Sequence, residues 1–97
     1  MIGIIHEVSF DKAIMTQYIH NYFVGVSVVV VSKKLIKIRF KNGAHVEISL
    51  NEADSNDLYY RAEIKKKFTN LELSCSYERH GIDSFDSLLK DINCFLG

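Results

Sequence analysis

Apolar residues recur along this chain at two different spacings, and the spacing changes from segment to segment. Between residues 10 and 22 they recur with the period of an amphipathic helix, and Ser9 can cap its first turn. Residues 24–31 are dominated by valine, which predicts a strand with both faces at least partly covered. The predicted core stripe of the helix consists of Ile14, Met15, Tyr18, Ile19 and Tyr22.

The next two segments, residues 36–41 and 44–50, alternate apolar and polar positions as half-buried strands do. A two-residue loop at Asn42-Gly43 would place Arg39 opposite Val46 and so mix the two faces. A three-residue loop that includes Lys41, with Gly43 left-handed, keeps the faces separate. This register pairs Phe40 with Ala44, Ile38 with Val46, Ile36 with Ile48, Arg39 with His45 and Lys37 with Glu47.

Residues 58–68 have the charge density of a helix, but their apolar residues share one parity and their charged residues the other. A second alternating segment, 71–78, follows a two-residue turn at Thr69-Asn70. The pattern therefore predicts a hairpin of two strands. Its expected pairs are Phe68 with Leu71, Ile64 with Cys75, Ala62 with Tyr77, Lys67 with Glu72 and Arg61 with Glu78.

A final helix is predicted from Asp83 or Ser84, with an apolar stripe of Phe85, Leu88, Leu89, Ile92, Phe95 and Leu96. The fold expected from these elements is α+β: a five-stranded antiparallel meander sheet with an N-terminal and a C-terminal helix on one face. Residues 2–8 are compatible with a sixth strand or with none. The other face of the sheet is expected to carry Lys37, Arg39, His45, Glu47, Tyr59, Arg61, Glu63, Lys65, Glu72, Ser74 and Ser76.

Length and composition limit what the chain can be. At 97 residues, with 47% hydrophobic and 25% charged residues, it has the size and balance of a single globular domain spanning residues 1–97. Neither a membrane-spanning apolar run nor a signal peptide is recognisable, so we expect a cytoplasmic protein with no membrane contact. We read the two cysteines as reduced thiols, Cys75 on the core face and Cys94 exposed.

The net charge is zero, but the charges are segregated along the chain. Residues 33–67 carry nine basic against five acidic residues, whereas residues 68–97 carry two against five. The basic residues could form a nucleic-acid footprint, although acidic residues interleave with them on the same face. This basic set comprises Lys33, Lys34, Lys37, Arg39, Lys41, Lys65, Lys66 and Lys67.

Candidate chemistry is sparse. The histidines His6, His20, His45 and His80 could in principle provide a general acid and base, as in a small nuclease. No nucleophile elbow, phosphate-binding glycine loop or metal-ligand spacing accompanies them. The sequence therefore predicts a protein that is not an enzyme and has no cofactor and no metal.

Two further surfaces are candidates for binding a partner. The acidic segment 51–57 lacks the glycine and the final glutamate of a calcium loop, but its charge suits docking on a cationic surface. Val29, Val31 and Leu35 share a non-core parity if residues 32–34 form a loop, and so they predict an apolar patch.

In size, charge and Ile/Asn/Lys-rich composition the chain resembles the immunity proteins of bacterial toxin systems, including those of contact-dependent growth inhibition. This resemblance implies a cytoplasmic inhibitor that binds one cognate toxin domain, often a nuclease, and covers its active site. The alternative is a nucleic-acid-associated regulator that uses the basic hairpin 33–41 and residues 65–67. The residues expected to contact a protein partner are Glu52, Asp54, Asp57, Tyr59, Arg61, Glu63, Glu78, Asp83 and Asp86.

Overall fold

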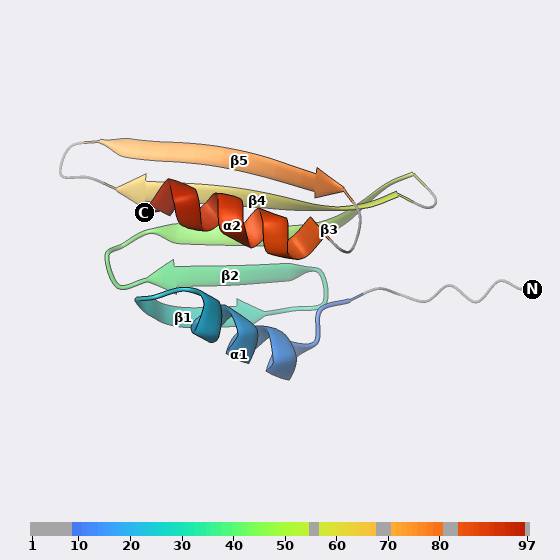
Figure 1. Cartoon of the computed structure of the whole chain (residues 1–97), viewed down its shortest axis with the longest axis horizontal. Helices are drawn as coiled ribbons and strands as arrows, with labels where there is room; N and C mark the ends of the chain where they lie inside the picture. The colour runs from blue at the N-terminus through green and yellow to red at the C-terminus, as the bar shows by residue number, and fades with distance from the viewer. Residues whose placement is uncertain (1–8, 55–56, 68–70, 81–83, 97) are drawn as a thin grey trace, which may run out of the picture.

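The computed structural model contains one sheet with two helices on the same face (Figure 1). It describes the backbone of residues 9–54, 57–67, 71–80 and 84–96, and the side chains of 9–51, 59–66, 71–80 and 84–96. The sheet is an antiparallel meander in the order β1-β2-β3-β4-β5, which confirms the predicted fold class. In chain order the elements are α1 (Lys12–Tyr22), β1 (Val26–Val31), β2 (Leu35–Phe40), β3 (His45–Asp54), β4 (Asp57–Lys67), β5 (Glu72–His80) and α2 (Phe85–Leu96).

The core is the layer between the sheet and the helices. Alternate residues of β2, β3 and β4 are buried there, and α2 contributes one face of four buried side chains. No helix in the described part of the chain is long and apolar enough to cross a membrane. The residues buried most completely are Ile19, Ile36, Ile38, Val46, Ile48, Ala62, Ile64, Leu88, Leu89 and Ile92.

The β2–β3 hairpin has the predicted register. Ile38 lies opposite Val46, and the Phe40 N–H donates to the Ala44 carbonyl at 2.9 Å. Gly43 has φ +92°, a conformation that side-chain-bearing residues rarely adopt. The Ala44 N–H also donates to the Asn42 side chain at 3.0 Å. Asn42 and Gly43 therefore each have a defined role in the turn.

The β4–β5 hairpin is confirmed as well. Ile64 lies opposite Cys75, Ala62 opposite Tyr77 and Arg61 opposite Glu78. The predicted pair of Phe68 with Leu71 lies outside the described residues. The parity of the charged residues was therefore a better guide to this segment than its overall charge density.

The start of α1 differs from the prediction. The N-cap is Asp11, whose carboxylate accepts a hydrogen bond from the Ile14 N–H at 2.9 Å, and not Ser9. Phe10 precedes the helix because its N–H donates to the Lys33 carbonyl and its ring packs against Tyr60.

The broad apolar stripe predicted for α1 divides into two. Met15, Ile19 and the following Phe23 face the core, whereas Ile14 is 63% exposed. Tyr18 and Tyr22 lie one and two turns beyond Ile14 on the same partly exposed flank. The reason is that α1 packs mainly against β1, at the margin of the sheet, so only a narrow side of the helix is covered.

The predicted patch of Val29, Val31 and Leu35 is wrong for the two valines. Val31 is buried and Val29 packs against the core, while Leu35 is half-buried. The Ser32 N–H donates to the Leu35 carbonyl at 2.7 Å, which makes the loop two residues long rather than three. That difference of one residue reverses the faces of β1 and exposes Val28 and Val30 instead.

Leu71 and Leu73, expected in the core, are 60% and 40% exposed. Leu73 lies opposite Lys66, whose ammonium donates to the carbonyls of Phe95 and Leu96 at the end of α2. Helix α2 therefore ends level with Leu73 and does not cover its side chain. Cys75, closer to the helix, is partly buried, and Cys94 is exposed as predicted.

Truncating α2 in the core should be costly. Ile92→Ala removes a fully buried side chain and should lower the free energy of unfolding by roughly 2–4 kcal/mol. Cys94→Ser, on the exposed side of the same helix, is the matched control and should change it by less than about 0.5 kcal/mol. Urea denaturation followed by circular dichroism measures both, and equal losses would contradict this orientation of α2.

Candidate partner-binding face

The face of the sheet that the helices leave uncovered is called the open face here. Its side chains alternate with those of the core along each strand, and most are exposed. All the polar residues predicted for it are found there, so the parity argument is confirmed for this face. It consists of Val28, Val30, Leu35, Lys37, Arg39, His45, Glu47, Ser49, Asn51, Tyr59, Arg61, Glu63, Lys65, Glu72, Ser74, Ser76, Glu78 and His80.

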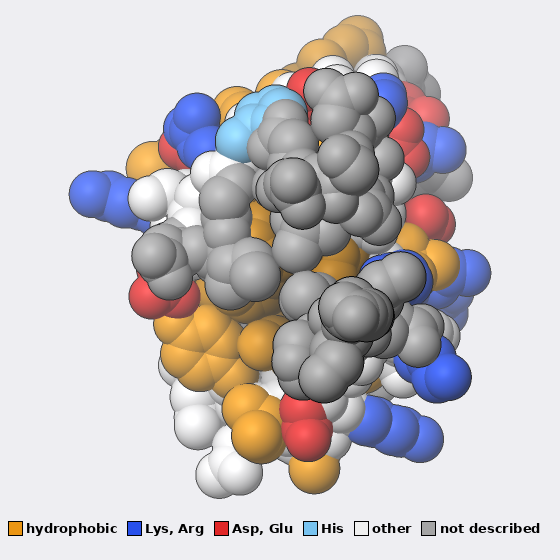
Figure 2. Space-filling view, turned by 90° about the vertical axis from the view of Figure 1, so that its right-hand side faces the viewer, with side chains coloured by type: hydrophobic (Ala, Val, Ile, Leu, Met, Phe, Trp, Pro, Cys, Tyr) orange, Lys and Arg blue, Asp and Glu red, His pale blue; other side chains and the backbone are white. Residues whose placement is uncertain are grey.

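The charge of the open face changes from strand to strand. On β2 it is basic, with Lys37 and Arg39, and on β5 it is acidic, with Glu72 and Glu78. The strands between them carry both signs. In Figure 2 the open face lies on the right, where basic side chains line the lower part and acidic ones appear higher up. The open face is thus basic on β2 and acidic on β5, with mixed charge on the strands between them.

Two depressions lie next to each other on the open face, and both are lined by His45 and Glu47. One, of about 300 Å³, extends over β4 and β5 to Glu63, Lys65 and Glu72. The other, of about 320 Å³, extends over β2 and β1 and has a partly apolar lining. The residues that line the second depression are Val28, Val30, Lys37, Ile38, Arg39, His45, Val46 and Glu47.

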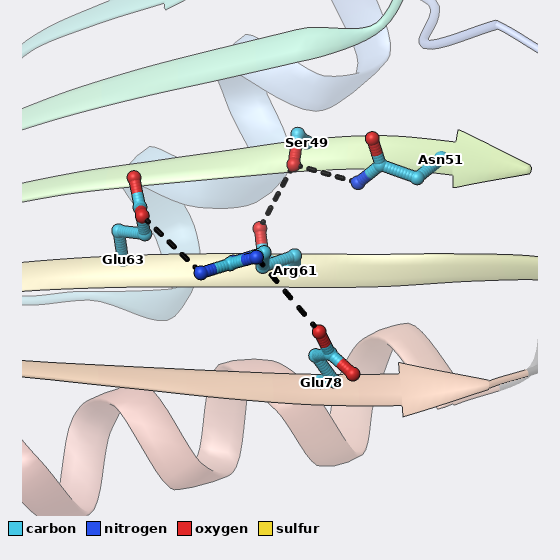
Figure 3. Close-up of polar contacts among 5 residues, drawn as sticks. All are labelled: Ser49, Asn51, Arg61, Glu63 and Glu78. Carbon is cyan, nitrogen blue, oxygen red and sulfur yellow. Dashed lines mark hydrogen bonds and ion pairs between the residues drawn. The ribbon is translucent and has the colours of Figure 1, made fainter. Parts of the chain in front are cut away.

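Arg61 is the centre of a polar network on β3, β4 and β5 (Figure 3). Its guanidinium lies 3.6 Å from the Glu63 carboxylate and 4.0 Å from that of Glu78. Its backbone carbonyl accepts a hydrogen bond from the Ser49 hydroxyl, which in turn accepts one from the Asn51 amide at 2.8 Å. Ion pairs this exposed contribute at most about 1 kcal/mol, so the network orders the side chains more than it stabilises the fold.

Tyr59 and His80 form a stacked pair at the end of the open face nearest the β3–β4 turn. Their ring centroids are 5.1 Å apart, with 25° between the ring planes. The sequence pattern placed Tyr59 on this face but missed His80, because the predicted strand ended at residue 78. Continuing the same parity along β5 would have found it, since the register pairs Tyr59 with His80.

The predicted contact residues do not all lie together. Tyr59, Arg61, Glu63 and Glu78 share the open face. Asp86 belongs to α2 and accepts a hydrogen bond from the Tyr18 hydroxyl of α1, so it lies on the helical side and links the two helices. The backbone of Glu52, Asp54 and Asp57 forms the ends of β3 and β4 next to their turn, and Asp83 lies outside the described residues.

The basic set is also divided. Lys37, Arg39 and Lys65 are exposed on the open face, but Lys66 binds the carbonyl end of α2, where a positive charge stabilises a helix. Lys66 is therefore directed away from the open face, whereas the basic residues of the β1–β2 and β2–β3 loops, Lys33, Lys34 and Lys41, are exposed beside β2.

The two histidines of the open face are too far apart to act on one bond. His45 lies opposite Lys65 and His80 opposite Tyr59, which places them roughly 20 Å apart along β4. His20 lies on α1, and His6 is outside the described residues. No group of three or more His, Cys, Asp or Glu side chains in the described part of the chain is arranged to hold a metal ion.

Comparison with models of known protein families, with curated proteins and with solved structures found no match. The fold and its side chains are therefore the basis of the functional argument. What they define is a small α+β domain in which one face of the sheet is core and the other is a charged surface.

The hydroxyl of Tyr18 should lose its proton at a higher pH than an ordinary tyrosine, because it donates a hydrogen bond to Asp86. The hydrogen bond to that carboxylate, together with some desolvation, raises the pKa of Tyr18 above its ordinary value near 10. The contact therefore contributes stability at and below pH 10 and loses it as the pH rises through the raised pKa. Asp86→Asn should return the pKa of Tyr18 to its ordinary range. Alkaline absorbance titration measures this, with Tyr18→Phe subtracted to isolate the Tyr18 signal, and an unchanged curve in Asp86→Asn would contradict the contact.

Proposed function

We propose that this protein is a non-enzymatic, cytoplasmic inhibitor of the immunity type, which binds a cognate toxin domain and blocks its active site by covering it. The observation that carries the proposal is the open face, a charged sheet surface that no helix of the described chain covers. The class of partner comes from the resemblance in size, charge and composition to bacterial immunity proteins.

The dimensions of the open face suit a protein partner. Five strands about 4.8 Å apart, each contributing about eight residues, give a surface of roughly 20 Å by 30 Å. That area approaches the roughly 800 Å² that each partner buries in a standard protein–protein interface. The two depressions are open, and charged groups line the first almost entirely and the second in part, unlike the enclosed apolar pockets that bind small molecules.

The acidic part of the open face favours a cationic partner, such as a nuclease that binds the phosphates of its substrate. Glu63, Glu72 and Glu78 are exposed on β4 and β5, and β3 and β4 end in the acidic residues next to their turn. The stacked pair of Tyr59 and His80 lies between these two groups of acids. Aromatic groups within a charged surface are typical of residues that dominate binding.

Reversing the acidic charge near the β3–β4 turn should weaken protection against the toxin. In the triple variant Glu52→Lys, Asp54→Lys and Asp57→Lys, association with the toxin domain encoded by the neighbouring gene should slow by about tenfold or more. Stopped-flow association and survival of cells that express the toxin measure the effect. Substituting Lys37, Arg39 and Lys65 by alanine is the matched control and should matter less.

The opposite ranking, with a binding constant for RNA or DNA that falls steeply with salt, would support the nucleic-acid alternative and contradict the proposal. Melting curves should show that both sets of variants remain folded, because exposed charges contribute little to stability.

The purified protein should also show no turnover of RNA or of ester substrates. Release of labelled product that disappears in His45→Ala or His80→Ala would refute the proposal that the protein acts by binding alone. Both histidines lie at the surface, so neither substitution should disturb the fold.

A further inference from the structure

Exposed apolar side chains are concentrated at one edge of the sheet. Of the eight large hydrophobic residues exposed in the described chain, six belong to α1, β1 or the segment between them. β1 is an edge strand whose one hydrogen-bonded neighbour among the described strands is β2. These six residues are Ile14, Tyr18, Tyr22, Val24, Val28 and Val30.

The backbone of β1 is positioned to accept another strand. The hydrogen bond from Ser32 to Leu35 makes these two residues a bonded pair, and bonded pairs alternate along an antiparallel ladder. Val30 and Val28 therefore bond to β2, while the N–H and C=O groups of Val29 and Val31 point toward the free edge. Pairing at this edge would satisfy those groups without breaking a bond within the sheet.

The two edges of the sheet differ in how they are protected against pairing. Proteins usually block an exposed edge with charged residues, proline or a bulge. β5 follows that rule and carries Glu72, Glu78 and Arg79. β1 consists of five valines and one serine, and its bulge, between Val26 and Val28, leaves the stretch that follows regularly paired with β2.

The charge beside β1 specifies what kind of strand would bind. Lys37 lies opposite Val30 and Arg39 opposite Val28, and both line the depression of about 320 Å³ on that side of the open face. Neither cation forms an ion pair with another described residue, whereas Arg61 does. An added strand would lie about 10 Å from β2, a distance that a long basic side chain and a carboxylate can span together.

We propose that the β1 edge binds an extended, acidic segment of a partner protein, which adds to the sheet as a further strand. Its main chain pairs with Val29 and Val31, and its side chains alternate between the two faces of the sheet. The carboxylates lie on the open face, beside Val28 and Val30, and reach Lys37 and Arg39, while the apolar side chains lie on the face that α1 covers. A second copy of this chain would bring the same cations to the edge and, from its own β1, no carboxylate. The inference stands independently of the toxin assignment, which concerns the acidic side of the open face.

The test uses the full-length protein and a short synthetic peptide of alternating glutamate and valine. In amide-resolved NMR titrations, the peptide should shift the signals of residues 28–31 and 37–39 in a saturable way. Lys37→Ala combined with Arg39→Ala should weaken binding by about tenfold. The matched control, Lys12→Ala with Lys90→Ala, removes two exposed charges from the helices and should leave binding unchanged.

Two control peptides separate the parts of the proposal. A peptide with lysine in place of glutamate should not bind, and equal binding would refute the role of charge. The acidic peptide with all of its backbone amides N-methylated keeps its charge but has no N–H group with which to pair as a strand, so its equal binding would refute strand addition. Shifts confined to β4 and β5, no saturable shift, or dimerisation of the protein alone through β1 in sedimentation would each overturn the proposal. None of these outcomes bears on protection against a toxin.

Discussion

The structure depends on one layer of apolar contacts between the sheet and its two helices. Ile38, Val46 and Ile64 lie on the buried side of three neighbouring strands, and Ile19 and Ile92 reach this side from α1 and α2. Burial of an aliphatic side chain of this size contributes about 1.5–3 kcal/mol, which exceeds any exposed ion pair in the molecule. Because both helices lie on one face, no described element covers the other face, and its side chains are mostly polar. The open face is thus a direct consequence of how the core is built.

Since the charges of the open face contribute little to stability, they can be arranged for binding. Arg61 and its two glutamates, the stacked Tyr59 and His80, and the cations of β2 are supported by strands whose opposite sides are fixed in the core. A rigid scaffold that carries a weakly constrained polar surface suits a protein whose task is recognition. The difference in charge between basic β2 and acidic β5 offers two chemically different surfaces on one sheet. This is why we assign a cationic partner to the acidic side and an acidic segment to the β1 edge.

Most of the fold could be predicted because parity is a strong constraint wherever one face is buried. The register of β2 with β3, and of β4 with β5, followed from keeping apolar residues such as Ile38 and Ile64 on one side. Prediction failed where a single local hydrogen bond decided the outcome. The bond from Ser32 to Leu35 set the faces of β1, and Asp11 rather than Ser9 set the start of α1.

Errors about exposure had a different cause. Leu73 has the correct parity for the core but lies beyond the end of α2, and Ile14 lies on the side of α1 that overhangs the margin of the sheet. The periodicity of a segment shows which side chains share a face, but it does not show how far a neighbouring element extends over that face. Periodicity likewise did not show that the carboxylate of Asp86, predicted as a partner contact, accepts a hydrogen bond from Tyr18 on the helical side of the molecule.

The central claim is that the open face, and not the helical side, meets the partner. The most direct test compares the aromatic ring signals of Tyr59 and His80 with those of Tyr18 and Tyr22 in the presence of a soluble paramagnetic probe. All four rings are at least partly accessible in the free protein, and the two pairs lie on opposite faces of the sheet. On adding the proposed partner, for which the product of the neighbouring gene is the candidate to be tried, we expect the probe to lose access to Tyr59 and His80 while Tyr18 and Tyr22 remain accessible. Protection of Tyr18 and Tyr22, with Tyr59 and His80 still accessible, would contradict the account.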